Sequence, residues 1–166
     1  MYDRETDSLW SHLLGAAVQG PMKGKRLELV PATFTDWQTW RRRHPDTHAL
    51  PGPAGDDFYT RSYTSSDSGV LGTRRAATRL EPNAVVLAVL RPAVKAYALR
   101  DLARVGRVKD TIAGRSVEVV YDRRSRSASA FTLSGHRREL LPSTPVFWFA
   151  WVAFFPGAPL WQHSGS

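Results

Sequence analysis

Residues 84–99 read AVVLAVLRPAVKAYAL, and this stretch decides the fold class that the sequence predicts. Its opening, AVVLAVL, is a continuous apolar run typical of a buried strand. VKAYAL, at its end, favours a second extended segment. Two neighbouring strand candidates therefore predict β-structure in the second half of the chain.

The residues that follow predict more strands around one short helix. A helical turn is expected at Arg100–Val105, with Leu102 and Val105 pointing inward. SVEVVYD (116–122) is a strand, RRSRS makes a turn, and ASAFTL (128–133) returns as the hairpin partner. Because two strands alone are not stable in water, this hairpin must pack on other elements.

The first half predicts a β-meander followed by a helix. Residues 8–13 alternate polar and apolar side chains, and RLELV (26–30) alternates again after several glycines. Thr35 with Gln38 three residues later matches a capping box, which predicts a helix that starts at Thr35. Pro45 then ends this helix.

A second tryptophan-rich helix is expected within 146–155, before Pro156. Trp148 and Trp151 follow Trp37 and Trp40 at a constant offset of 111 residues, which predicts an internal repeat. Tyr-Asp-Arg also occurs twice, at residues 2–4 and 121–123, but at an offset of 119. The two offsets disagree, so a segment was inserted, lost or wrongly paired.

We therefore predict an α+β domain that is mainly β. A curved antiparallel sheet or partly open barrel would be covered by the two short tryptophan-rich helices. Residues 1–50 form the first-repeat meander and helix, 51–83 a connector, and 84–166 the second-repeat strands and helix, within one compact domain. Strands of residues 1–34 are expected to complete the sheet of residues 84–133.

Composition excludes several classes of site. The chain has no cysteine, which excludes disulfides, zinc–thiolate sites and thiol nucleophiles. Its formal net charge of +8 raises nucleic acid or an anionic surface as a partner. The arginines are dispersed along the chain rather than gathered in a stripe, so nucleic acid is not the favoured partner.

Location is not fixed by the sequence. The charged N-terminus does not match a secretory signal, which makes a cytoplasmic location the default expectation. Residues 140–161 carry no charge, but prolines interrupt them, so no transmembrane span is predicted.

Weak candidates for catalysis lie in the second half of the chain. An enzyme of unknown reaction would use a polar cleft built from Lys95, Tyr97, Asp101, Asp110 and His44. The structural alternative, which we favour, places Lys95 toward solvent on an edge strand. Convergence of three or more of these residues in one cleft, with a shifted pKa, would favour the enzyme.

Other site types have weaker support. His44, Asp46 and His48 are the nearest approach to a metal cluster, but Pro45 breaks the helical spacing that two histidines need, and His44 fits a helix C-terminus better. No phosphate-binding glycine loop occurs, and we expect no cofactor. Trp37, Trp40, Trp148 and Trp151 would make a ligand platform, although core packing explains them more simply.

The chain resembles a prokaryotic domain-of-unknown-function family, number 3179. Members carry MYDRxTGSLW, GPxxGxxL and a tryptophan-rich helix that ends in HPDT, and this chain has MYDRETDSLW (1–10), GPMKGKRL (20–27) and HPDT (44–47). The family motifs KAYPL and VND are similar to KAYAL (95–99) and VKD (108–110). SVEVVYDRRSRSASAF and FWFAWVAFFP also match elements of the family's second half.

The departures from the family pattern are specific. Members have a Cys-Pro-Leu-Cys-Gly segment before the MYDR motif, and this chain starts at that motif. The second half also lacks the meander that should follow Phe131. The resemblance therefore predicts a truncated or rearranged member, either a permuted single repeat or a gene fragment.

The resemblance implies an uncharacterised family member, often exported, with a pocket at the KAYPL and VND segments. We expect a non-catalytic or degenerate domain that binds a ligand, either a small molecule or a protein partner. The alternatives are the enzyme described above and a basic protein that binds nucleic acid or anionic surfaces.

Overall fold

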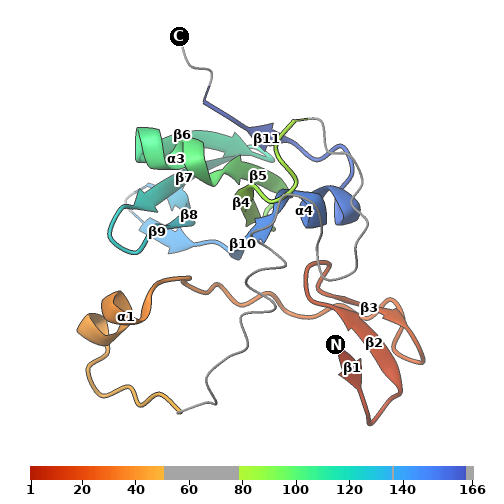
Figure 1. Ribbon diagram of the computed structural model, residues 1–166. Helices are drawn as coiled ribbons and strands as arrows, with labels where there is room; N and C mark the ends of the chain where they lie inside the picture. The colour runs from red at the N-terminus through yellow and green to blue at the C-terminus, as the bar shows by residue number, and fades with distance from the viewer. Residues whose placement is uncertain (51–78, 136, 164–166) are drawn as a thin grey trace. The chain divides into compact units, whose positions relative to one another are not determined.

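A computed structural model describes residues 1–50, 79–135 and 137–163 of the chain. It divides into two compact units, Met1–Pro31 and Ala32–Ser166 (Figure 1). Within the described residues the structure contains three sheets and three short helices, so the prediction of a mainly β, α+β chain is confirmed.

The first unit is a three-stranded antiparallel sheet, sheet A. Its strands are β1 (Tyr2–Asp3), β2 (Ser8–Ser11) and β3 (Ala16–Gln19), in that order. Gly20 follows with a φ of +89°, and a Cβ there would come within 2.5 Å of the Asp7 carbonyl oxygen. Only glycine fits this close approach of the two backbone segments. Beside it, the Met22 amide donates a hydrogen bond of 3.1 Å to the hydroxyl of the buried Ser8.

The expected strand at residues 26–30 is wrong. Arg26 forms an isolated bridge to Ala16, and the Leu27 amide donates to the Gly15 carbonyl oxygen, but no further ladder forms. Alternating side chains alone do not make a strand when no neighbouring strand offers a continuous edge.

Sheet B is built on the stretch at residues 84–99. Its order is β10-β4-β5-β11, with bounds Ser143–Phe147, Val85–Val89, Lys95–Ala98 and Leu160–Trp161. β11 runs parallel to β5, and the other pairs are antiparallel. The prediction of two adjacent strands at 84–99 is confirmed.

Sheet C is a four-stranded antiparallel meander. Its strands are β6 (Arg107–Ile112), β7 (Arg115–Asp122), β8 (Ser127–Ser134) and β9 (Arg137–Leu140). The predicted hairpin is confirmed as β7 and β8.

The main core lies between the inward faces of sheets B and C. Leu87 pairs with Tyr97 on one sheet and Val119 with Ala130 on the other, and all four side chains belong to one buried cluster. α3 (Leu99–Val105) contacts strands of both sheets and adds Leu102, which is fully buried (Figure 1). The predicted helical turn is confirmed, but Val105 is exposed rather than inward.

The opposite face of sheet B carries small, fully buried side chains, including Ala88 and Ala96. α4 (Trp148–Phe154) contacts β4 and β10, and its Trp148 and Trp151 are buried. Large indole rings fit a surface of small side chains at high packing density.

α1 (Trp37–Arg43) occupies the position predicted for the first tryptophan helix, but its cap differs. The Asp36 carboxylate, not Thr35, accepts from the Thr39 amide at 2.7 Å. His44 ends the helix before Pro45, as predicted, because its amide donates to the Trp40 carbonyl oxygen.

The predicted common sheet of residues 1–34 and 84–133 is wrong. Among the described residues, β1–β3 form a sheet of their own, and β4–β9 belong to sheets B and C. The domain boundaries at 50 and 83 and the internal repeat stay predictions, and most of the connector lies outside the described residues. None of the helices in the described ranges is long and apolar enough to cross a bilayer.

Candidate functional site

Three of the predicted polar residues meet between sheets B and C. Lys95 and Tyr97 lie two residues apart on β5, so both point to the inward face of sheet B. Asp110 pairs with Val117 and shares the inward face of sheet C. The strand registers therefore direct all three side chains into the space between the sheets.

Asp110 is the centre of this polar cluster. Its Oδ2 lies 2.7 Å from Lys95 Nζ and accepts a hydrogen bond of 2.7 Å from the Tyr97 hydroxyl. Its Oδ1 accepts from the Thr111 amide, also at 2.7 Å. The Lys95 and Asp110 side chains are 20% and 17% exposed, whereas Tyr97 is fully buried. The cluster fastens β5 to β6 and satisfies its own charges.

The electrostatic environment moves two pKa values away from neutrality. Burial alone would raise the pKa of Asp110, but hydrogen bonds from Lys95 and Tyr97 outweigh it and hold that pKa below its ordinary value. Burial, helped by the hydrogen bond to Asp110, raises the pKa of Tyr97 well above its ordinary value. An acid or base that works near pH 7 needs the opposite directions.

The other two residues proposed for the polar cleft have separate partners. Asp101 is buried on α3, where its carboxylate accepts from the His163 amide at 3.3 Å and lies 3.5 Å from Arg100 Nε. His44 is exposed at the end of α1, with its ring 4.1 Å from that of Trp40.

Lys95 does not guard a sheet edge, so the structural alternative favoured from the sequence is wrong. β5 has β4 on one side and β11 on the other, and Lys95 points inward to Asp110.

His44, Asp46 and His48 are all exposed. In the parts of the chain that the structure describes, no three His, Cys, Asp or Glu side chains are grouped closely enough to hold a metal ion.

The four tryptophans divide into two pairs. Trp148 and Trp151 are core residues, as the simpler interpretation predicted. Trp37 is 47% exposed on α1, so the core interpretation is wrong for that residue. Trp40 is half-buried, and its indole nitrogen donates to the Thr47 hydroxyl at 3.0 Å.

A second buried carboxylate was not expected from the sequence. Glu118 on β7 lies 2.9 Å from Arg107 and 3.1 Å from Arg138, on the face of sheet C opposite the core. Arg138 in turn lies over the Phe131 ring, 3.5 Å from its centroid. The sequence analysis predicted a strand here but no partners for Glu118, and both arginines come from other strands, β6 and β9.

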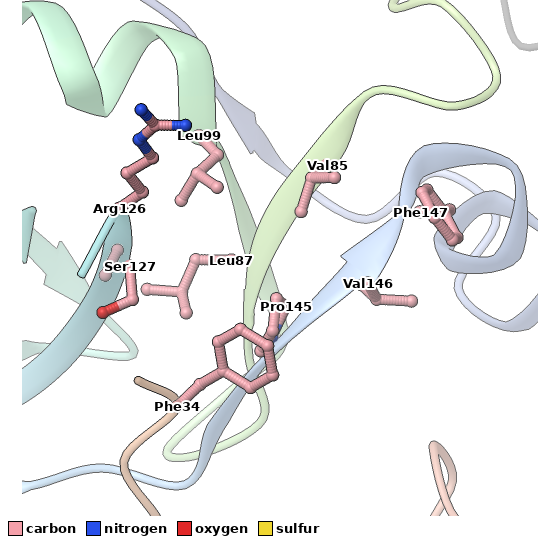
Figure 2. A pocket seen from close by; sticks show the side chains of 10 residues that line it. Phe34, Val85, Leu87, Leu99, Arg126, Ser127, Pro145, Val146 and Phe147 are labelled. Carbon is pink, nitrogen blue, oxygen red and sulfur yellow. The ribbon is translucent and has the colours of Figure 1, made fainter. Parts of the chain in front are cut away.

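An apolar cavity of about 390 Å³ lies at one end of the space between the sheets. Figure 2 shows Leu87 and Val85 on β4 facing the cavity, with Phe34 and Pro145 beside them. Leu99, Ala128, Val146 and Phe147 complete the apolar lining. No sequence pattern indicated this cavity, because its walls come from five separate segments.

Two polar residues line the cavity, Arg126 in the β7–β8 turn and Ser127 at the start of β8. Ser127 is buried, and its hydroxyl lies 2.8 Å from the Ser125 hydroxyl. Arg126 is exposed, and Figure 2 shows its side chain running past Leu99 at the rim.

The model of the family described as "Protein of unknown function (DUF3179)" matches residues 1–140. The chain belongs to this family. Neither a curated protein nor a solved structure matches it.

Membership in the DUF3179 family gives the polar cluster its sequence signal. KAYAL supplies Lys95 and Tyr97, VKD supplies Asp110, and these two short motifs meet at one carboxylate. The N-terminal segment contains the one departure from the MYDRxTGSLW pattern of the resemblance. Asp7 stands where TGSLW has glycine, its φ is +51°, and its carboxylate accepts a hydrogen bond from the Tyr2 hydroxyl. Aspartate tolerates this left-handed conformation better than most residues.

Proposed function

We propose that this chain is a binding domain for a small, largely apolar ligand, which the cavity between sheets B and C receives. The cavity itself carries this proposal. Its volume of about 390 Å³ falls within the range of small-molecule sites, and eight of its ten lining residues are apolar.

The lining is rigid enough to be a preformed site. Leu87 and Ala128 are buried in the main core, and Pro145 lies on β10 opposite Leu87. Side chains fixed by a sheet lose little further freedom when a ligand binds. The polar cluster also fixes the two sheets to each other, because Asp110 on β6 binds Lys95 and Tyr97 on β5.

An enzyme that uses the polar cluster is the second candidate function. Its support is the convergence of Lys95, Tyr97 and Asp110 in one half-buried place. Two observations weigh against acid–base catalysis there. The Asp110 carboxylate already accepts from three donors, and the pKa shifts of Asp110 and Tyr97 make a weaker base and a weaker acid.

Binding of nucleic acid or another polyanion is the third candidate. Arg107 and Arg138, on the open face of sheet C, are both paired with Glu118, which lowers the positive potential of that face. Binding that weakens steeply with added salt would support this function, and no binding at low salt would end it.

Filling the cavity tests the proposed function. Ala128→Leu adds three carbon atoms to the lining, and Ala153→Leu makes the same change on an exposed position of α4. We expect the neutral fluorescent probe N-phenyl-1-naphthylamine to bind the wild type and Ala153→Leu alike, and Ala128→Leu at least about tenfold more weakly, as expected for a lost site of about 1.4 kcal/mol or more.

Val85→Phe is a second filling variant, for use if Ala128→Leu does not fold. Circular dichroism checks the fold of each variant. Unchanged probe affinity in a folded filling variant would contradict the proposed site.

A further inference from the structure

We infer that the ligand is a single-chain amphiphile whose anionic head group is bound by Arg126. This inference rests on the proposed function, because it names the chemical class of the ligand for the same cavity.

The charge at the cavity has one sign. Among the described residues that line it, Arg126 is the only charged one, and no carboxylate faces it across the opening. A guanidinium beside an apolar wall matches a ligand that joins a hydrocarbon body to a carboxylate or phosphate.

The Arg126 guanidinium is available to a ligand. Within the described ranges it has no hydrogen bond and no ion pair, although Arg43, Arg107 and Arg138 all have acidic partners. Arg126 is exposed, and Figure 2 shows its side chain beside Leu99, so its charged end is open to solvent next to the apolar lining.

The backbone of Arg126 breaks a local rule of hairpin turns. Its φ is +50°, in the left-handed region where glycine is the usual choice after a short turn. A non-glycine residue without a local hydrogen bond is strained there. Arg126 therefore occupies a left-handed turn position and lines the cavity at the same time.

The size of the cavity limits the hydrocarbon body. A volume of about 390 Å³ is equivalent to roughly a dozen water-sized groups at ~30 Å³ each. Decanoate, with nine hydrocarbon carbon atoms and one carboxylate, matches this space and places its charge at one end. Decanol has the same body without the charge.

The comparison of these two compounds tests the inference. Each is titrated below its aggregation limit against the bound N-phenyl-1-naphthylamine probe, at low ionic strength. We expect the wild type to bind decanoate about fivefold more tightly than decanol, as expected for one exposed ion pair of about 1 kcal/mol. Arg126→Gln should remove this preference and leave decanol binding unchanged.

Arg124→Gln is the matched control, because Arg124 lies in the same turn but does not line the cavity. It changes the net charge equally and should keep the preference for decanoate. Arg126→Gly is a second variant, and glycine suits the left-handed backbone conformation at this position. It should also lose the preference for decanoate over decanol, and this result would show that the lost guanidinium, and not damage to the turn, is the cause.

The outcomes distinguish two kinds of failure. If neither compound displaces the probe, the proposed function fails and this inference with it. Equal affinity of the wild type for decanoate and decanol would leave the proposed function intact and overturn the anionic head group. A preference that survives in folded Arg126→Gln, or binding to phosphatidylglycerol vesicles that decanoate does not compete, would overturn the assignment as well.

Discussion

Asp110 connects the two sheets of the second unit through a single carboxylate. Lys95, Tyr97 and Thr111 all donate to it, and two of its three donors come from the neighbouring sheet B. The resemblance to the family pointed to these residues through KAYAL and VKD. The sequence did not predict their contact, since β6 was not recognised as a strand and the direction of the Asp110 side chain was therefore unknown.

Replacing this carboxylate should destabilise the fold. Asp110→Asn leaves the Lys95 ammonium without its counter-ion, and removal of one partner from a buried pair costs about 3–5 kcal/mol. Both side chains keep some exposure, so we expect a loss of about 1–3 kcal/mol in the free energy of unfolding, measured by urea denaturation. Glu139→Gln, at an exposed ion pair, should change it by less than about 0.5 kcal/mol. Equal effects of the two variants would refute the structural role of Asp110.

The same carboxylate should make stability depend on pH in acid. The pKa of Asp110 is lowered in the folded state, so its contribution is present above the unfolded value of about 3.9 and is lost as pH falls through the folded pKa. Urea denaturation between pH 5 and pH 2 should therefore show a steeper loss for the wild type than for Asp110→Asn. Parallel curves would show that Asp110 has the same pKa in the folded and unfolded chains.

At the scale of elements, the two tryptophan helices were predicted in position but not in burial. Trp spacing and the prolines at 45 and 156 located both, and α1 and α4 begin and end at equivalent positions, 111 residues apart. Their sequences do differ in a way that matches the burial: α1 reads WQTWRRR and leaves Trp37 exposed, whereas α4 reads WFAWVAF, is apolar throughout and buries Trp148.

Substitutions at the start of α1 test whether Asp36 or Thr35 caps the helix. Asp36→Ala removes the acceptor of the Thr39 amide and should destabilise the helix by about 1 kcal/mol. The Thr35 hydroxyl is buried without a hydrogen-bond partner in the described structure, so Thr35→Val should be neutral or slightly stabilising. Exchange of the His44 amide, which donates to Trp40, reports the difference by NMR. Faster exchange in Thr35→Val than in Asp36→Ala would restore the cap predicted from the sequence.

Several strands could not be predicted because they are stabilised by neighbouring strands and not by a pattern in their own residues. β9 is polar and β11 has two residues, so both depend on the edges of β8 and β5. β10 was assigned in part to the last helix, since Val146 and Phe147 continue the apolar run of α4 without a break. Apolar character alone does not separate a buried strand from a buried helix.

At the scale of the molecule, the sequence predicted the class and missed the division of the sheets. The mainly β, α+β class followed from the stretch at residues 84–99 and the hairpin at 116–133. The expected common sheet was wrong because sheet C completes itself with β6 and β9, so the hairpin packs on strands of its own half. The sequence correctly predicted that the β7–β8 hairpin needs further strands, but it did not predict that these strands are β6 and β9.

The cavity likewise belongs to the assembled fold rather than to any segment. β4 and β8 each contribute two lining residues, β10 contributes three, and α3 contributes Leu99. Its function as a ligand site is the central claim about this protein. The proposed anionic amphiphile gives that claim a definite geometry, with hydrocarbon beside Leu87 and Pro145 and a carboxylate at Arg126.

A crystal structure of the chain with decanoate tests this claim most directly. We expect continuous density for the hydrocarbon chain between Leu87, Ala128 and Pro145, with the carboxylate within hydrogen-bond distance of the Arg126 guanidinium. A cavity closed by its own side chains, or decanoate bound only elsewhere on the surface, would contradict it.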